Sequence, residues 1–157
     1  MATTSKAAKA PAKKASVKKA SPAKVFSDDE MAAMQAAKSE RKKGSKADGG
    51  ADLKAAIDKL SGLDRTIAEG IHAIVTANAP GLAPKTWYGL PAWANADGKA
   101  VIFLTPASKF KSRYAAVGFS DLSTLDDGEM WPTAFAITKL GDAEKKKLAA
   151  LVKKAAG

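Results

Sequence analysis

Cysteine is absent from this chain of 157 residues, and histidine occurs once. Without cysteine there can be no disulfide, no thiolate nucleophile and no zinc–thiolate centre. No apolar run approaches the roughly 20 residues that a membrane-spanning helix needs, and no apolar segment of a signal peptide follows the basic N-terminus. We therefore expect a cytoplasmic protein with no membrane partner.

The usual sequence signatures of enzymes are also missing. No GxSxG, P-loop, GxGxxG or HExxH motif occurs, so hydrolase, nucleoside-triphosphatase, dinucleotide-binding and zinc-protease functions lose their usual support. His72 follows a helical pattern beside Glu69 and Thr76, where we expect a half-exposed side chain without a catalytic role. A non-enzymatic protein without a cofactor is expected, and a small enzyme that acts on an anionic metabolite is an alternative.

Positive charge is concentrated near the N-terminus. Of the net charge of +10, most belongs to residues 1–50, which carry 12 basic and 5 acidic residues. Residues 1–26 are rich in Lys, Ala and Pro, and with so little apolar surface we expect them to form a disordered tail. Mobile lysines displace counterions from DNA or RNA without reading bases, which predicts weak, salt-sensitive association with nucleic acid and a nucleoid-associated location. A solubility extension is the alternative. The tail lysines are Lys6, Lys9, Lys13, Lys14, Lys18, Lys19 and Lys24.

Residues 27–50 are expected to form a helix and a glycine-rich linker before a folded domain over residues 51–157. Ser27 and Glu30 have the spacing of a capping box, and Gly44 would end the helix. Two further helices are predicted by apolar residues that recur on one face. Those residues are Leu53, Ala56, Ile57 and Leu60 in the first helix, and Ile67, Ile71, Ile74 and Val75 in the second.

From Thr86 the apolar period changes from that of a helix to that of a strand. Strands are predicted over residues 86–94, 99–104, 112–119 and 133–138, and a helix from about Asp142 with Leu148, Leu151, Val152 and Ala155 on its apolar face. This order indicates an α+β fold. We expect an antiparallel sheet of about four to five strands, packed against N-terminal helices and a C-terminal helix.

The order of these segments carries a resemblance. KTWYGLPAW, GKAVIFL, KFKSRYAAVGFSD and LDDGEMWPTAFAIT, followed by a lysine-rich helix, resemble the YdhG-like family of small bacterial proteins over roughly residues 52–156. That resemblance implies an antiparallel sheet flanked by helices. Some members are described as frataxin-like iron chaperones, which makes iron binding an alternative function by resemblance. The tail in turn resembles the lysine-rich tails of linker histones.

Two neighbouring segments are candidates for a binding surface. Aromatic residues crowd the segment from Lys85 to Ala94, and basic residues alternate with aromatic ones from Lys109 to Tyr114. On a strand, the three basic residues of the second segment would share one side. Cations neutralise an anion while rings stack on a flat group, so this combination predicts a small anionic ligand or a protein partner. The candidates are Trp87, Tyr88, Pro91, Trp93, Lys109, Lys111, Arg113 and Tyr114.

Each segment also has a structural interpretation. The aromatic residues could pack under the helices as core, together with Phe103 and Trp131, and the basic residues could guard an exposed strand edge. Four carboxylates lie within nine residues, and such a group could bind a hard cation such as iron, although turns and helix caps use the same residues. They are Asp121, Asp126, Asp127 and Glu129.

Overall fold

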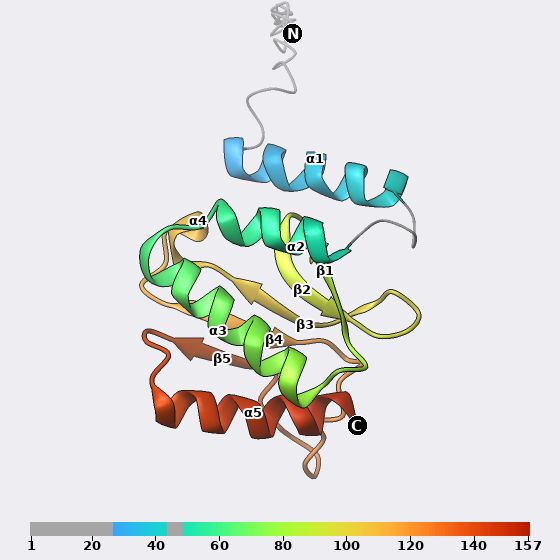
Figure 1. Cartoon of the computed structure of the whole chain (residues 1–157), viewed down its shortest axis with the longest axis vertical. Helices are drawn as coiled ribbons and strands as arrows, with labels where there is room; N and C mark the ends of the chain where they lie inside the picture. Colours follow the sequence, from blue (N-terminus) through green and yellow to red (C-terminus); the bar gives the residue numbers. More distant parts are fainter. Residues whose placement is uncertain (1–26, 44–48) are drawn as a thin grey trace, which may run out of the picture.

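The computed structural model describes residues 27–43 and 49–157 of the chain. The predictions made for residues 1–26, and for Gly44 as the end of the first helix, fall outside these residues. The elements follow in the order α1 (Asp28–Lys43), α2 (Gly49–Asp58), α3 (Gly62–Asn78), β1 (Ala83–Trp87), β2 (Leu90–Ala94), β3 (Ala100–Thr105), α4 (Ala107–Phe110), β4 (Ala115–Phe119), β5 (Ala134–Ile137) and α5 (Asp142–Ala156) (Figure 1).

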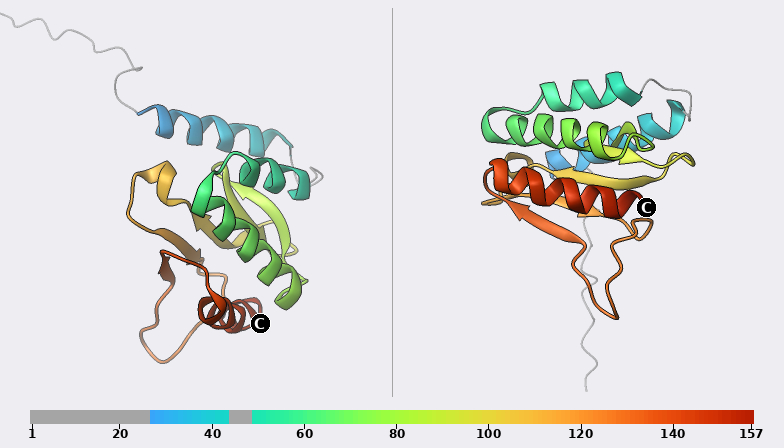
Figure 2. Two further views of the ribbon diagram at one scale, coloured as in Figure 1. Left: turned by 60° about the vertical axis from the view of Figure 1, so that its left-hand side comes forward. Right: turned by 60° about the horizontal axis from the view of Figure 1, so that its bottom comes forward.

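The sheet has five strands in the order of the sequence, and every neighbouring pair is antiparallel. Helices α2, α3 and α5 lie along one face of this sheet (Figure 2). The α+β fold with an antiparallel sheet of about four to five strands, predicted from the sequence, is therefore confirmed. Helix α1 lies outside this layer, beyond α2 at one end of the molecule (Figure 1).

Trp93 of β2 lies at the centre of the core, where its side chain is 1% exposed. Its neighbours across the two adjoining strands are Pro84 and Ile102, so these residues share its face of the sheet. The indole Nε1–H donates to His72 Nδ1 of α3 over 3.3 Å, and the centroids of the two stacked rings lie 6.3 Å apart. The single histidine thus satisfies a buried donor, and its side chain is half-exposed, as the sequence predicts.

The predicted capping box at the start of α1 is confirmed. Ser27 N–H donates to Glu30 Oε2 over 2.8 Å, and Glu30 N–H donates to Ser27 Oγ over 3.3 Å. The apolar positions expected in α2, α3 and α5 also face the core, as the burial of Leu53, Ile67 and Val152 shows. Helix α2 begins at Gly49, so the last two residues of the expected linker belong to a helix.

The strand predicted over residues 86–94 is wrong as a single strand. The chain reverses at Tyr88 and Gly89, and the two halves, β1 and β2, pair with each other from Ala83↔Ala94 to Trp87↔Leu90. Trp87 lies on the face opposite Trp93, where its ring meets Phe103 edge to face at 5.0 Å.

Replacing His72 with alanine would leave the Trp93 indole N–H without its acceptor in a buried site. We expect the H72A variant to lose about 1–3 kcal/mol of unfolding free energy, the usual cost of an unsatisfied buried donor. Urea denaturation of the full chain measures this loss.

The matched control is Trp93→Phe, which removes the donor. In a double-mutant cycle, His72→Ala should cost clearly less when residue 93 is phenylalanine. An equal cost in both backgrounds would show that the hydrogen bond does not contribute.

Candidate functional site

The β1–β2 hairpin ends in a two-residue turn that presents aromatic side chains. Tyr88 and Gly89 have φ angles of 53° and 75°, and positive φ at both central positions is the requirement of a type I′ turn. Glycine adopts this conformation without steric cost, whereas a tyrosine does so rarely. Trp87 and Tyr88 are 36% and 45% exposed, and their rings lie 5.3 Å apart.

A cavity of about 1060 Å³ opens beside this turn. Its walls come from the C-terminal half of α1, the start of α2, strand β1 and the β2–β3 turn. Trp87 and Tyr88 supply aromatic surface, and Arg41 and Lys85 supply positive charge. Lys85 Nζ also donates to Gly98 O over 2.8 Å, which holds its ammonium group at the cavity wall. Three carboxylates, Glu40, Asp52 and Asp97, line the same cavity, so the arrangement offers stacking surface and groups of both charges to one ligand.

Helix α1 closes one side of the cavity through Glu40. The two oxygens of the Glu40 carboxylate accept from Tyr88 N–H over 3.1 Å and from Gly89 N–H over 3.0 Å. The side chain of Ala36 packs against the same turn, because a Cβ added to Gly89 would lie 3.1 Å from the Cβ of Ala36. Sequence reasoning did not select Glu40, since nothing in its local pattern indicates a partner 48 residues away.

Two of the predicted site residues lie in the core instead. Pro91 and Trp93 are both fully buried, so they cannot contact a ligand at the surface. Phe103 and Trp131 are both partly buried, but only Trp131 packs against the core, whereas Phe103 lies with Trp87 on the opposite face of the sheet. The structural interpretation therefore holds for Trp93 and Pro91, while Trp87 and Tyr88 remain accessible.

The basic segment is not a strand, because α4 and a loop occupy residues 107–114. Lys111 adopts a left-handed conformation with φ of 51° at the end of α4, so the predicted alternation of Lys109, Lys111 and Arg113 on one side is wrong. Strand β4 begins only at Ala115.

Only the first residue of this segment reaches the hairpin turn. Lys109 Nζ would lie 3.6 Å from a Cβ added to Gly89. Lys111, Arg113 and Tyr114 are exposed and do not line the cavity, and the Arg113 guanidinium stacks 5.2 Å from the ring of its own neighbour, Tyr114. Of the eight predicted residues, Trp87 and Tyr88 line the cavity, and Lys109 lies beside Gly89 of the turn but is not part of the cavity lining.

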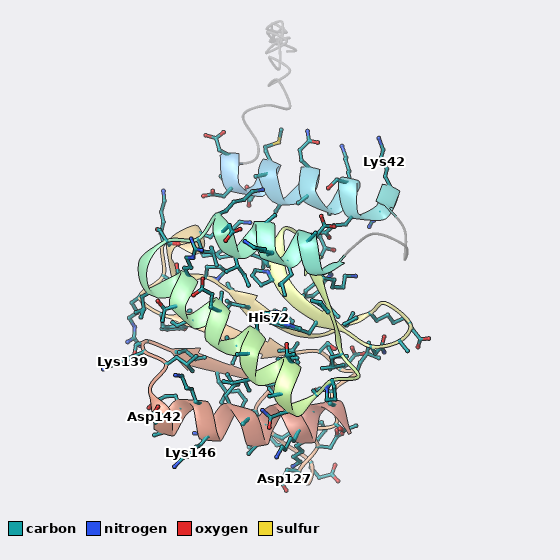
Figure 3. All side chains as sticks on the ribbon, viewed as in Figure 1. Lys42, His72, Asp127, Lys139, Asp142 and Lys146 are labelled. Carbon is teal, nitrogen blue, oxygen red and sulfur yellow. The ribbon has the colours of Figure 1, made fainter. Side chains whose placement is uncertain are left out.

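The four carboxylates after β4 do not converge. Asp121, Asp126, Asp127 and Glu129 are all exposed, and Asp127 projects from the end of the molecule opposite α1 (Figure 3). In the part of the chain that the structure describes, no three His, Cys, Asp or Glu side chains are placed to hold a metal ion. The predicted metal site at these four residues is therefore not formed.

Asp64 is a buried carboxylate that sequence reasoning missed. Its oxygens accept from Ala107 N–H over 3.0 Å and from Ser108 N–H over 2.8 Å, which ties the first turn of α3 to the start of α4. Burial by itself would raise the pKa of Asp64, but hydrogen bonds from the side chain and backbone of Ser108 and from Ala107 N–H lower it below its usual 3.8. This contact helps to place Lys109, the next residue of α4.

A second cavity, of about 410 Å³, lies between α2 and α3 and is lined in part by His72. Its rim carries a chain of ion pairs, in which Asp58 accepts from Lys54 over 2.6 Å and from Arg65 over 3.1 Å, and Glu69 accepts from Arg65 over 2.8 Å. These groups are exposed and paired with one another. The Asp58–Arg65 pair links α2 to α3, but exposed ion pairs such as these add little stability.

None of the helices in the described part of the chain is both long enough and apolar enough to cross a bilayer. Comparison of the chain with protein-family models, curated proteins and solved structures finds no match. The resemblance to the YdhG-like family therefore stays a prediction.

The lowered pKa of Asp64 predicts a dependence of stability on pH. A carboxyl group whose pKa is lower in the folded than in the unfolded state stabilises the fold above its unfolded pKa, near 3.9, and this contribution is lost as the pH falls through its folded pKa. We expect Asp64→Asn to lower the unfolding free energy at pH 7 by about 1.5–3 kcal/mol, the range for hydrogen bonds to a charged group.

The difference between the Asp64→Asn variant and the natural chain should shrink as the pH falls below the unfolded pKa and through the lower folded pKa, because Asp64 then becomes neutral in both states. Urea denaturation across the pH range measures it. Asp127→Asn is the matched control, since Asp127 is exposed, and it should show no such gap. A gap for Asp64→Asn that stays constant with pH would contradict the assignment.

Proposed function

We propose that this chain is a non-enzymatic binding protein of the bacterial cytoplasm. Its folded domain binds a small anionic ligand at the β1–β2 turn, and its lysine-rich segment associates with nucleic acid, which places it at the nucleoid. The observation that carries the proposal is the exposure of Trp87 and Tyr88 at the wall of a cavity that also holds Arg41 and Lys85. Exposed aromatic residues beside cations suit a ligand with a flat ring and a phosphate or carboxylate.

The position of the single histidine favours binding over catalysis. His72 Nδ1 accepts from the Trp93 indole, so the residue on which serine–histidine chemistry would depend serves the core. The turn beside the aromatic surface is held in place by Glu40, whose carboxylate accepts hydrogen bonds from the backbone N–H groups of Tyr88 and Gly89. No observation on the described residues favours the iron-chaperone function over this one.

The lysine-rich segment adds a separate interaction. Residues 1–24 carry seven lysines and no acidic residue, whereas the charge of residues 51–157 is nearly balanced at 14 basic against 11 acidic. Nucleic-acid binding that depends on phosphate neutralisation should therefore depend mainly on these seven lysines. It should also be insensitive to base sequence.

AMP is a suitable probe of the domain surface because it joins a flat ring to a phosphate. In an NMR titration of the full chain, we expect the indole N–H signal of Trp87 to shift saturably. Trp87→Ala should weaken binding by about 1–3 kcal/mol, the usual contribution of stacking one base.

The signal of the Trp93 indole is an internal control, because Trp93 is 1% exposed and its N–H already donates to His72. A Trp87 signal that does not respond to AMP, or equal shifts of both indoles, would argue against a ring-binding surface at the turn.

Binding of duplex DNA across a salt series tests the lysine-rich segment. Each phosphate contact contributes about −0.9 to the slope of log K against log salt, so changing all seven lysines to glutamine in the full chain should reduce the slope by up to about 6. The affinity at low salt should fall in parallel.

The matched control changes exposed lysines of α5 to glutamine, which should leave most of the slope in place. Equal slopes for the two variants would refute a specific role of the N-terminal lysines. The control lysines are Lys145, Lys146, Lys147, Lys153 and Lys154.

A further inference from the structure

The turn between β1 and β2 already holds a carboxylate. Each oxygen of Glu40 accepts one backbone N–H, from Tyr88 over 3.1 Å and from Gly89 over 3.0 Å. The two donors are consecutive along the chain, and together they grip both oxygens of one carboxylate. The hydrogen-bonding pattern therefore shows which chemical group this turn accommodates.

The geometry of the turn explains why these donors are available. In a two-residue hairpin, the flanking pair, here Trp87 and Leu90, closes the strand ladder, so the two central N–H groups have no partner within the hairpin. Successive N–H groups in such turns form a concave site for anions. Because both groups belong to the backbone, the site does not depend on the identity of a side chain.

Positive charge beside the turn is not used by Glu40. Lys109 Nζ lies near Gly89, within 3.6 Å of the position that a Cβ would occupy. Among the residues that the structure describes, no carboxylate forms an ion pair with Lys109. A ligand with a second negative charge could pair with this ammonium group while its carboxylate took the place of Glu40.

Helix α1, which carries Glu40, contributes little apolar surface to the fold. Its two methionines, Met31 and Met34, are 41% and 46% exposed, and none of its described side chains is fully buried. Most helical stability in proteins comes from packing of an apolar face. Because this helix has little such packing, it is held to the domain largely by individual contacts, including the hydrogen bonds of Glu40. Displacing this helix would therefore expose little apolar surface.

We propose that the β1–β2 turn is a carboxylate-binding site that Glu40 occupies as an internal competitor, and that an external ligand with two or more negative charges displaces α1 from it. The inference rests on the proposed binding role of this surface and adds the chemistry of the ligand and a means of control. Because Glu40 is tethered to the site, it competes at an effective concentration in the millimolar range. A ligand whose own affinity is weaker than this cannot displace Glu40 and binds only when α1 is released by other means.

Amide NMR of the full chain tests this proposal directly, through the Tyr88 and Gly89 signals. The probes are succinate, a free dicarboxylate, and a synthetic peptide of residues 28–43, which carries the same carboxylate on a helix. They are titrated into the natural chain, Glu40→Ala, and the matched control Asp29→Ala, which removes a charge from an exposed position of α1.

We expect both amide signals to shift saturably in Glu40→Ala, with an affinity at least severalfold higher than in the natural chain or in Asp29→Ala. Lys109→Gln, combined with Glu40→Ala, should weaken succinate binding severalfold. A response to succinate alone identifies a free carboxylate as the ligand, and a response to the peptide alone identifies a protein-borne one. Either response supports the site.

The proposal is overturned if neither probe shifts the two amides in Glu40→Ala, or if all three chains bind with equal affinity. Glu40→Gln is the second variant should alanine alter the helix, and the remaining amide signals report whether the domain is folded. The AMP titration monitors the Trp87 indole and the salt series monitors the lysines, so failure of the carboxylate site is distinct from failure of the proposed function.

Discussion

The burial of Trp93 is the constraint on which the rest of the domain depends. It is among the largest fully buried side chains, and it joins the central sheet to α3 through both its ring and its N–H group. An indole of this size cannot be buried without an acceptor for its donor, and His72 is that acceptor. Because side chains alternate along a strand, placing Trp93 in the core places Trp87 on the opposite face once the chain has turned.

The placement of Trp87 determines which aromatic side chains lie together on the outer face of the sheet. The ring of Phe103 lies directly over Gly118, where a Cβ would come within 2.3 Å of the ring, so only glycine fits. Trp87 then packs edge to face against Phe103. A rigid sheet therefore presents aromatic side chains next to the two amides of the turn that donate to Glu40, which is how a structural hairpin acquires a surface suited to recognition.

Much of the fold follows from local patterns in the sequence. The apolar spacing of α2, α3 and α5 and the capping box of α1 each depend on residues within a few positions of one another, and they were predicted correctly. The prediction of one strand over residues 86–94 failed because a tyrosine is uncommon at positive φ, and a Tyr-Gly turn is not an obvious hairpin signal.

The candidate site was predicted only in part, for a related reason. Trp87, Tyr88 and Lys109 were selected by composition, and the antiparallel pairing of β2 with β3 brings α4 to the same end of the sheet as the turn. The alternation expected for the basic segment assumed a strand, whereas Asp64, 43 residues away, caps a short helix there. Neither Asp64 nor Glu40 carries a local signal of its partner.

The sequence by itself determined the α+β class, the core faces of the helices and the concentration of lysines at the N-terminus, because each is a property of neighbouring residues or of composition. Tertiary structure alone decided which aromatic residues are buried and which are exposed, and that Glu40 meets the amides of the hairpin turn. Those outcomes depend on contacts between segments tens of residues apart, and the geometry of such contacts is set by the packing of the whole sheet against its helices.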